Sequence, residues 1–375
     1  MEPESSVTVR SGEVVALRLF DIAYAIDLAR AEAAWLARAG GEGRRGRLTS
    51  ASPKALAFDV PPLDLPLEPL NLMLDGVEVT AQARVRLYDF GVAALAVRVA
   101  VADAPWSGFA ACFNAMDRAV GPSAPDTLWT TLRQRVVDGI APALDRPAVD
   151  TLLQEDYLLG VVHALDPPLD AQALRERIDL AALLSGETRP LSESARRELL
   201  AHSYSYYADD LVLLTWDRAF IYEPRRDSDV ADVIEVANAQ LVEFRYYDIL
   251  LDSELPRMYA RVQQARGTGS LLAARRFAHL ARGLYMLVAE ATELTEKVDN
   301  ALQVTEDVYL ARVYSTALGL FRVPALSASV DRKLAIIRDT YAALYEEASS
   351  RRSEWLEIAI VLLIVLEVVL SLLRH

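Results

Sequence analysis

The sequence is poor in cysteine and histidine, the residues on which disulfide frameworks and many metal sites depend. Cys112 is the single cysteine of the 375 residues, so an internal disulfide is excluded and a thiolate metal site cannot form within one chain. The four histidines, at positions 163, 202, 279 and 375, are too far apart to show ligand spacing. We therefore expect a chain in a reducing compartment, with no bound metal.

The sequence also lacks the common motifs of catalysis and nucleotide binding. It contains neither a GxxxxGK[ST] loop nor an HExxH helix, and no nucleophile and base stand at a recognisable spacing. The stretch GGEGRRG, 40–46, matches GxGxxG, but it follows a predicted helix and precedes a predicted strand, the reverse of a phosphate-binding turn. We predict that the protein is not an enzyme and takes no cofactor.

Positive charge is scarce, because 39 Lys and Arg stand against 53 Asp and Glu and give a net charge of −14. This balance works against nonspecific attraction to nucleic acid phosphates. The densest basic cluster, Arg44, Arg45 and Arg47, is explained by a solvated loop, with contact to RNA as the alternative. The first residues, MEPESSVTVR, resemble neither a secretory signal nor a transit peptide. Direct binding of nucleic acid is not expected.

The chain has one long apolar run, at its C-terminal end. Thirteen Ile, Leu or Val residues lie between Ile358 and Leu373. As a helix, the stretch from Trp355 to Leu373 is about 28 Å long, close to the ~30 Å hydrocarbon thickness of a bilayer. Each aliphatic side chain favours insertion by about 0.3–0.6 kcal/mol, and together they exceed the roughly 2.5–3.5 kcal/mol cost of Glu367. The run predicts a C-terminal transmembrane helix.

The residues around this run predict how it would be placed. Arg351 and Arg352 precede Trp355, which suits an interfacial aromatic and a cytoplasmic body. Glu367 and Arg374 are seven residues apart and share a helix face, so we predict that Glu367 contacts a partner or a second copy. The alternative is a buried core helix, or the seam of a soluble oligomer.

The first 225 residues mix strand and helix patterns. They predict a strand over 12–20, a helix over 21–39 and a long hairpin over 77–101 that turns near 89–91. Further expected elements are a strand over 54–60, helices over 107–120 and 126–140, a strand over 156–165, a helix over 169–185 and short strands over 201–224. The order strand, helix, hairpin occurs twice, which leaves a duplicated module open.

Residues 226–353 carry a helical pattern. Apolar residues recur every seven positions at Val230, Ala237, Phe244, Leu251 and Met258. The stretch 265–270 interrupts the pattern, and Leu284, Ala291 and Val298 then resume it. We predict two long antiparallel helices, the first bent at Pro256, followed by one or two helices that lead into the C-terminal run.

Acidic residues on the second of these helices predict a charge network. Glu290 and Glu293 lie three apart on one helix face, but the Glu-x-x-His pairs of di-metal bundles are missing. We expect these carboxylates to pair with arginines such as Arg245 and Arg312 on neighbouring helices, and so to fix helix register.

Three helical stretches in the C-terminal half resemble a known family. They are IEVANAQLVEFRYYDILLDSELPRMY, ELTEKVDNALQVTEDVYLARVY and RKLAIIRDTYAALYEE, followed by the apolar tail. In this order they resemble the YagE family, also called the required-for-meiotic-nuclear-division family, over residues 200–373. In this resemblance Glu357 and Glu367 occupy the family's glutamate positions. It implies a single-pass, oligomeric membrane protein, linked in mitochondria to translation support, and supplies no catalytic residues.

Together these patterns predict an α+β protein with three parts: a mixed α/β domain over 1–225, a helical, coiled-coil domain over 226–353 and a transmembrane anchor over 354–373. The expected function is a non-enzymatic, tail-anchored scaffold of a bacterial inner membrane. It would be a homo-oligomer, with most of the chain cytoplasmic, its C-terminus across the membrane and its α/β domain facing a cytosolic protein partner. One alternative is an enzyme or ligand sensor with a site around Asp209, Asp210, Trp216 and Asp217. The other is the soluble oligomer with the last helix as its seam.

Overall fold

The computed structural model describes residues 7–39, 44–45, 56–57, 60–148, 153–187, 189–226, 229–266, 270–299, 303–304 and 307–373. The chain divides into two compact units. Unit 1 comprises Met1–Arg245 and Lys297–Pro324, and unit 2 comprises Tyr246–Glu296 and Ala325–His375. The division therefore falls inside three helices, at 245–246, 296–297 and 324–325, whereas the sequence suggested boundaries near 225 and 353.

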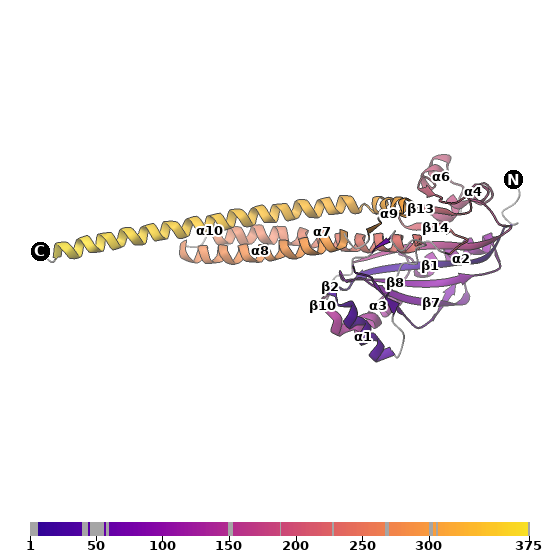
Figure 1. Ribbon diagram of the computed structural model, residues 1–375, viewed down its shortest axis with the longest axis horizontal. Coiled ribbons are helices and arrows are strands. Elements are labelled where there is room, and N and C mark those ends of the chain that lie inside the picture. The colour runs from indigo at the N-terminus through magenta and orange to yellow at the C-terminus, as the bar shows by residue number, and fades with distance from the viewer. Residues whose placement is uncertain are drawn as a thin grey trace. The chain divides into compact units, whose positions relative to one another are not determined.

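The helices and strands follow each other in a mixed order (Figure 1). The helices are α1 (Leu28–Ala39), α2 (Trp106–Val120), α3 (Thr127–Ile140), α4 (Ala171–Arg177), α5 (Leu180–Ser185), α6 (Glu193–Leu199), α7 (Val230–Arg266), α8 (Ser270–Asp299), α9 (Val308–Leu320) and α10 (Val323–Leu373). The strands are β1 (Thr8–Asp21), β2 (Ala23–Ile26), β3 (Arg44–Arg45), β4 (Leu56–Ala57), β5 (Leu63–Pro66), β6 (Leu70–Leu74), β7 (Val77–Leu87), β8 (Val92–Val101), β9 (Ala104–Pro105), β10 (Leu144–Pro147), β11 (Gln154–Asp166), β12 (Ser203–Tyr204), β13 (Leu211–Leu214), β14 (Arg218–Tyr222) and β15 (Gln303–Val304).

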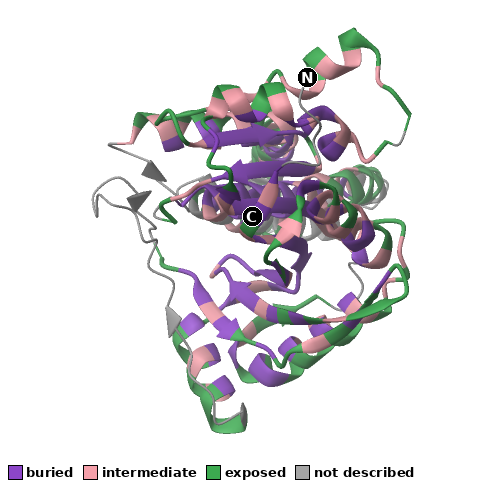
Figure 2. Cartoon of the chain, turned by 90° about the vertical axis from the view of Figure 1, so that its right-hand side faces the viewer, coloured by how far each residue is buried: buried purple, intermediate pink, exposed green. Residues whose placement is uncertain are grey.

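Unit 1 is built on one large sheet with the strand order β12-β13-β14-β11-β1-β8-β7-β5-β3, to which β6 and β9 add at β7 and β1. The pairs β1–β11, β1–β8 and β7–β8 are antiparallel, while β11 and β14 run parallel. Every residue of β1 from Val14 to Asp21 is buried, so both faces of this part of the strand are covered (Figure 2). Strands that are covered on both faces carry mostly apolar residues at successive positions. β1 and β11 therefore form the centre of the unit.

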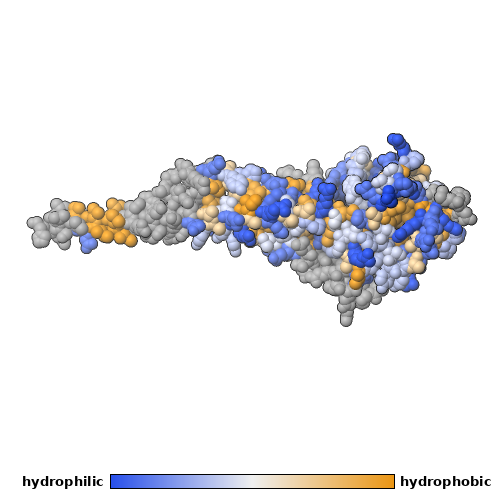
Figure 3. Space-filling model, turned by 90° about the horizontal axis from the view of Figure 1, so that it is seen from above, coloured by the Kyte–Doolittle hydropathy of each residue, from blue (hydrophilic) through white to orange (hydrophobic). Residues whose placement is uncertain are grey.

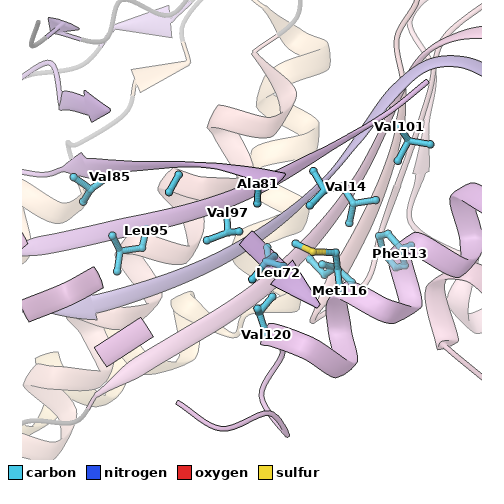
Figure 4. Close-up of a cluster of buried hydrophobic side chains, with 14 of the residues drawn as sticks. Val14, Leu72, Ala81, Val85, Leu95, Val97, Val101, Phe113, Met116 and Val120 are labelled. Carbon is cyan, nitrogen blue, oxygen red and sulfur yellow. The ribbon is translucent and has the colours of Figure 1, made fainter. Parts of the chain in front are cut away.

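One face of this sheet packs against α2 and α3. Val14 of β1, Leu95 and Val97 of β8, and Phe113 and Met116 of α2 all lie in one hydrophobic cluster (Figure 4). Successive side chains of a strand point to opposite faces of a sheet. The even-numbered residues of β1 and the odd-numbered residues of β7 and β8 therefore lie on this face. Burial of these side chains supplies the main hydrophobic stabilisation of unit 1.

The opposite face of β7 meets α7 through buried charges. Arg84 donates to Glu235 at 2.8 Å and Arg86 to Asp232 at 2.7 Å, while both arginines also bind Asp64 of β5. The phenol of Tyr88 donates to Glu235 at 3.2 Å. Burial by itself would raise the pKa of Asp232, but the guanidinium groups of Arg86 and Arg84 hold it below its ordinary value. This network fixes the first turns of α7 against the strand.

Unit 2 contains the second part of α7, most of α8 and the long α10. α7 ends at Arg266 and α8 begins at Ser270, and Figure 1 shows the two helices side by side. All five residues of the first heptad series, from Val230 to Met258, are buried, as are Ala291 and Val298 of the second series. The predictions of two long helices and of the apolar stripe of α7 are confirmed, whereas Leu284 of the second series is only half-buried.

Several local predictions agree with the structure and others do not. The strand over 12–20, the hairpin over 77–101 and the helices over 107–120 and 126–140 are confirmed as β1, β7–β8, α2 and α3. Residues 21–39 are not one helix, because Ala23–Ile26 instead pairs with β10 before α1 begins. The helix predicted over 169–185 is divided into α4 and α5, since Asp179 caps a new helix by accepting from the Ala182 N–H. The strand predicted over 54–60 lies largely outside the described residues, as do the glycines of 40–46 and Arg47.

The suggested duplication is not matched by strand pairing. The second strand of the first hairpin, β8, lies antiparallel to β1, whereas the second strand of the later hairpin, β14, lies parallel to β11. The two strand-helix-hairpin segments therefore enter the sheet differently.

The predicted transmembrane anchor is wrong. In the part of the chain that the structure describes, no helix combines the length and apolarity that crossing a membrane requires. Residues 354–373 form the end of the 51-residue α10, whose earlier part is rich in charged residues, and Glu367 interrupts the apolar run. The membrane and tail-anchored assignments, and the location with the C-terminus across a bacterial inner membrane, are corrected accordingly.

Candidate functional site

A small cavity in unit 1 brings together charged residues from three segments of the chain. Its volume is about 250 Å³, and it lies where β1, β11 and the turn between β13 and β14 meet the end of α2. Polar and aromatic side chains lining it are Asp117, Asp156, Tyr157, Trp216, Asp217 and Arg218. Asp117 lies in α2 and the others lie in β11, in the β13–β14 turn or at the start of β14, so the scaffold fixes their positions.

The strand register explains how these residues meet. In the β1–β11 ladder Arg18 stands opposite Asp156, and in the parallel β11–β14 ladder Leu158 stands opposite Arg218. The Leu158 N–H also donates to the Asp217 carbonyl at 3.0 Å, which fixes the β13–β14 turn beside β11. Asp217 and Asp156 are therefore neighbours although 61 positions separate them in the sequence.

Arg218 is the most strongly held charge of the cavity. Its Nη2 donates to the Asp117 carboxylate at 2.7 Å, and its Nε lies 3.4 Å from the Asp217 carboxylate. The guanidinium lies over the Phe113 ring and next to Gly186, which fixes its plane. Arg218 is 9% exposed, and its Nη1 has no hydrogen-bond partner within the described residues.

Within the described residues, no guanidinium group forms an ion pair with the Asp156 carboxylate. Burial raises the pKa of this carboxyl group. Arg18 lowers that pKa, while Asp217 and Asp117 raise it further. Arg18 itself is buried, with Nη2 donating to the Val120 carbonyl at 3.2 Å, and desolvation lowers its pKa. Among the carboxylates that line the cavity, Asp156 is therefore the one that no guanidinium group binds within the described residues.

Two residues at the edge of the cavity differ in their surroundings. The phenol of Tyr157 is fully engaged, because it donates to carbonyls of Thr215 and Arg218 at 2.9 Å. The indole of Trp216 is 73% exposed, which is unusual for so large an apolar group. Trp216 therefore offers an accessible aromatic surface beside a charged cavity.

A larger groove of about 1040 Å³ lies along α1 and α3 and the segment after β5. Its charged groups already have partners: Arg135 binds Glu68 at 2.8 Å, and Arg38 donates to the Asp138 carbonyl. Paired groups at a surface offer less to a ligand than the incompletely paired groups around Asp156.

The alternative site suggested by the sequence is divided by the structure. Trp216 and Asp217 line the cavity, whereas Asp210 accepts from the Tyr206 and Tyr207 N–H groups in a separate turn, and Asp209 is exposed. No sequence pattern pointed to Arg18, Asp117, Asp156 or Arg218, because the pairing of distant strands and the packing of α2 make them neighbours. Within the described residues, no group of three or more His, Cys, Asp or Glu side chains could hold a metal ion.

The second candidate feature lies in unit 2, at the end of α10. Large apolar side chains there are about half exposed or more, and Figure 3 shows them gathered near the C-terminal end of the helix. They are Ile360, Val361, Leu362, Leu363, Ile364, Val365, Leu366, Val369 and Leu370. Glu367, within this stretch, is also exposed.

The other predicted site residues are distributed over both units. Trp355 and Glu357 belong to α10, but their side chains, and Arg374 altogether, lie outside the described residues. Their predicted contacts stay predictions.

In the predicted charge network, Arg245 forms an ion pair with Glu155, and the Arg312 guanidinium lies 5.6 Å from the centre of the Tyr204 ring. Glu290 is half-buried and Glu293 is exposed. Pairing of these two glutamates with the arginines stays a prediction.

Comparison with known proteins points to a family. The family model described as "Uncharacterized protein MJ0711, N-terminal domain" matches residues 11–229, more than half of the chain. Uncharacterized protein MJ0711 of Methanocaldococcus jannaschii is 26% identical over 242 residues, which cover 64% of this chain and 73% of that protein. No solved structure matches.

The predicted membership of the YagE or required-for-meiotic-nuclear-division family is therefore wrong. That resemblance rested on residues 200–373, most of which form long amphipathic helices. Heptad patterns of this kind recur in unrelated helical proteins, since any packed long helix needs an apolar stripe. The family match instead lies on the sheet domain, whose residues include the whole cavity.

Proposed function

The chain belongs to the family of the MJ0711 N-terminal domain, and on that premise we propose that it is a scaffold whose copies associate through the end of α10 and thereby display several copies of unit 1. A role as a scaffold for a protein partner and the absence of catalysis were both expected from the sequence, and both stay predictions. The proposal adopts the reading in which the last helix is an oligomer seam.

The observation that carries this proposal is the apolar surface of α10. Val330, Ile337 and Leu344 are seven residues apart and buried within unit 2. The same seven-residue series reaches Val365, and the companion series of buried Leu334 reaches Leu362 and Val369. These are the a and d positions of a heptad repeat, which pack against another helix. Arg351 falls in the same series and marks a break between the two parts.

The two parts of the apolar stripe on α10, before and after Arg351, differ in their partners, and this difference favours a second copy of the chain as the partner of the later part. The first part of the stripe has partners within its own chain: Lys333 binds Asp248 at 2.7 Å and Tyr341 lies 5.8 Å from Tyr285 between ring centres. Figure 1 shows α10 continuing beyond the α7–α8 hairpin. A second α10 carries the same stripe and so provides a matching helix in register. Full burial of a Leu or Val stabilises by roughly 1.5–3 kcal/mol, enough for several such residues to offset the cost of association.

The heptad also separates residues that face a second copy from those that do not. Leu362, Val365 and Val369 lie on the seam, whereas Ile360, Leu363 and Glu367 lie at the outward f, b and f positions. Outward residues are as exposed in the chain as seam residues, so the two sets form a matched comparison.

The experiment measures the mass of the full chain by size-exclusion chromatography with light scattering. The unmodified chain is expected to be an oligomer. Combined Leu362→Lys and Val369→Lys substitutions should weaken association at least tenfold, about 1.4 kcal/mol, because two charges would enter each seam. Combined Ile360→Lys and Leu363→Lys substitutions should leave the mass unchanged.

Three results would overturn the proposal: an unmodified chain that is monomeric, equal loss of mass in both double variants, or an oligomer that survives the seam substitutions. If the unmodified chain and both double variants all stay dispersed only in detergent, lipid rather than a second copy covers the apolar surface. Circular dichroism of each variant shows whether α10 remains helical.

A further inference from the structure

A surface pocket between β12 and α9 has no part in the self-association of α10, and its side chains suit an anionic ligand. We propose that it binds a small phosphomonoester that also carries a hydroxyl group, with the phosphate against Arg312 and the hydroxyl groups beside it, and the ligand's own hydroxyl against Asp307. The inference does not depend on the scaffold proposal, because the residues that line the pocket belong to unit 1.

The pocket is built along one face of α9 and has a volume of about 380 Å³. It is lined by Tyr204 of β12 and by Asp307, Val308, Ala311, Arg312, Ser315 and Thr316. From position 308 onward, the α9 residues recur every three to four positions, which places them on one side of the helix. Sites for small organic molecules typically have volumes of roughly 300–1,000 Å³. The pocket therefore admits a small organic ligand and is larger than a single ion needs.

The Arg312 guanidinium supplies the positive charge of the pocket. It lies 5.6 Å from the centre of the Tyr204 ring, and this cation–π contact holds the group in place without using its N–H groups as hydrogen-bond donors. Arg218 binds the Asp117 carboxylate at 2.7 Å, whereas Arg312 forms neither a hydrogen bond nor an ion pair through its guanidinium within the described residues. Arg312 is exposed and lines the pocket, so a ligand can reach its donors.

Hydroxyl groups next to Arg312 are the second, independent argument. The hydroxyls of Tyr204 and Thr316 bind each other at 2.5 Å, and either can be the donor. Because one hydrogen suffices for this bond, the pair can donate once more to a ligand. Ser315 adds a third hydroxyl to the lining. The two parallel N–H groups of a guanidinium occupy both oxygens of a carboxylate, whereas a phosphate has a third strong acceptor oxygen for these hydroxyls.

Asp307 defines the other end of the pocket. Its Oδ1 caps α9 by accepting from the Leu310 N–H at 3.0 Å, and a carboxylate has a second oxygen that can accept from a ligand hydroxyl. Five positions separate Asp307 from Arg312, which is about 7.5 Å along a helix axis. This separation keeps the carboxylate away from the phosphate and matches a ligand of a few carbon atoms. Val308, which is 74% exposed, provides apolar contact for those carbons.

The test titrates the intact full chain with glycerol 3-phosphate in an isothermal titration calorimeter. Glycerol, which lacks the phosphate, and inorganic phosphate, which lacks the hydroxyl-bearing part, probe each half of the ligand. Glycerol 3-phosphate is expected to bind with a dissociation constant in the millimolar range or below. It should bind about tenfold more tightly than glycerol and about fivefold more tightly than inorganic phosphate.

Arg312→Gln is the decisive variant, because it removes the positive charge from an exposed side chain of α9. It should weaken the binding of glycerol 3-phosphate at least tenfold. Arg322→Gln is the matched control, since Arg322 is an exposed arginine of the same unit that does not line the pocket. It changes the net charge by the same amount and should leave binding unchanged. Circular dichroism of both variants checks that the fold is retained.

Tyr204→Phe tests the hydroxyl pair separately from the charge. It keeps the ring that holds Arg312 and removes one hydroxyl group. Binding of glycerol 3-phosphate should therefore weaken about threefold, less than in Arg312→Gln.

Failure of glycerol 3-phosphate to bind would overturn the inference, as would equally tight binding of inorganic phosphate or unchanged binding by Arg312→Gln. Equal losses in Arg312→Gln and Arg322→Gln would also overturn it, because they would show only a general attraction between phosphate and positive charge. None of these results bears on the mass of the oligomer, which tests the scaffold proposal by itself.

Discussion

At the scale of single residues, Asp21 shows how burial sets an ionisation equilibrium. The carboxyl group lies at the end of β1, is 4% exposed and accepts from the Ala23 N–H. Burial raises its pKa to about 7, and the hydrogen bond from Ala23 opposes that rise. A raised pKa means that folding favours the protonated form, so this contribution to stability is complete below the unfolded pKa and is lost as the pH rises through about 7.

Asp21→Asn should therefore remove a pH dependence. Relative to the unmodified chain, the variant gains stability between pH 5 and pH 8, by roughly 1.4 kcal/mol for each pH unit from 5 to about 7. Urea unfolding of both proteins at the two pH values measures this difference. If the difference in the free energy of unfolding between the two proteins is the same at both pH values, the raised pKa is not that of Asp21.

Gly91 is required by the backbone of the hairpin between β7 and β8. Its φ is +98°, and a Cβ there would lie 1.8 Å from the Ala23 carbonyl oxygen. Gly91→Ala should destabilise unit 1 by about 2 kcal/mol or more, since both the conformation and the space are unsuitable for a side chain. Chemical denaturation gives the free energy of unfolding.

Gly108 in α2 provides the control for this substitution. A Cβ at that position would make only ordinary contacts, the nearest at 3.5 Å from Pro105. Gly108→Ala should be neutral or stabilise by about 0.5–1 kcal/mol, because glycine is unfavourable inside helices. Equal losses for the two glycines would show that the close approach at Gly91 has no special cost.

At the scale of elements, the contact between β7 and α7 depends on buried ion pairs. Glu235 is 2% exposed and binds Arg84 at 2.8 Å. Glu235→Gln should destabilise the protein by on the order of 3 kcal/mol, because it removes the most deeply buried of the three carboxylates that balance the charges of Arg84 and Arg86. Thermal and urea unfolding both measure this loss.

The exposed pair of Glu68 and Arg135 has the same distance, 2.8 Å, and so isolates the effect of burial. The Glu68 side chain is 82% exposed, and Glu68→Gln should cost about 1 kcal/mol or less. A cost at Glu235 no larger than at Glu68 would contradict a stabilising role of the buried network.

The elements that the sequence predicted well are those with a clear local period. The hairpin of β7 and β8 alternates apolar and polar residues, and the heptad stripe of α7 is buried along its length. β2 was read as part of a helix because its strand character depends on β10, more than 100 residues later. Local patterns cannot report such a partner.

At the scale of the whole molecule, the chain consists of two compact units that share α7, α8 and α10. We predict two transitions in calorimetric unfolding. Ile337→Ala, at a fully buried position of unit 2, should lower only one of them, and Leu95→Ala in the core of unit 1 only the other. Each substitution should cost about 2–5 kcal/mol. One transition that moves with both variants would mean that the units unfold together.

The whole molecule also explains why the functional predictions had different outcomes. The tail of α10 is apolar in sequence, but what covers such a helix is not encoded in its composition. The cavity was suggested only through Trp216 and Asp217, since Arg18, Asp117 and Asp156 carry no motif and lie far apart along the chain. Only the folded structure shows that, among the described residues, no three His, Cys, Asp or Glu side chains are arranged to hold a metal ion.

The sequence alone determined the long strands β1, β7 and β8, the long helices and the apolar face of α7, because side-chain periodicity acts between near neighbours. It also determined the net charge of −14 and the impossibility of an internal disulfide. Only the tertiary structure decided the strand order, the burial of Glu235 beside Arg84 and the meeting of Asp156 with Arg218. These features depend on contacts between segments that are far apart in the sequence. No single segment therefore shows them in its own residues.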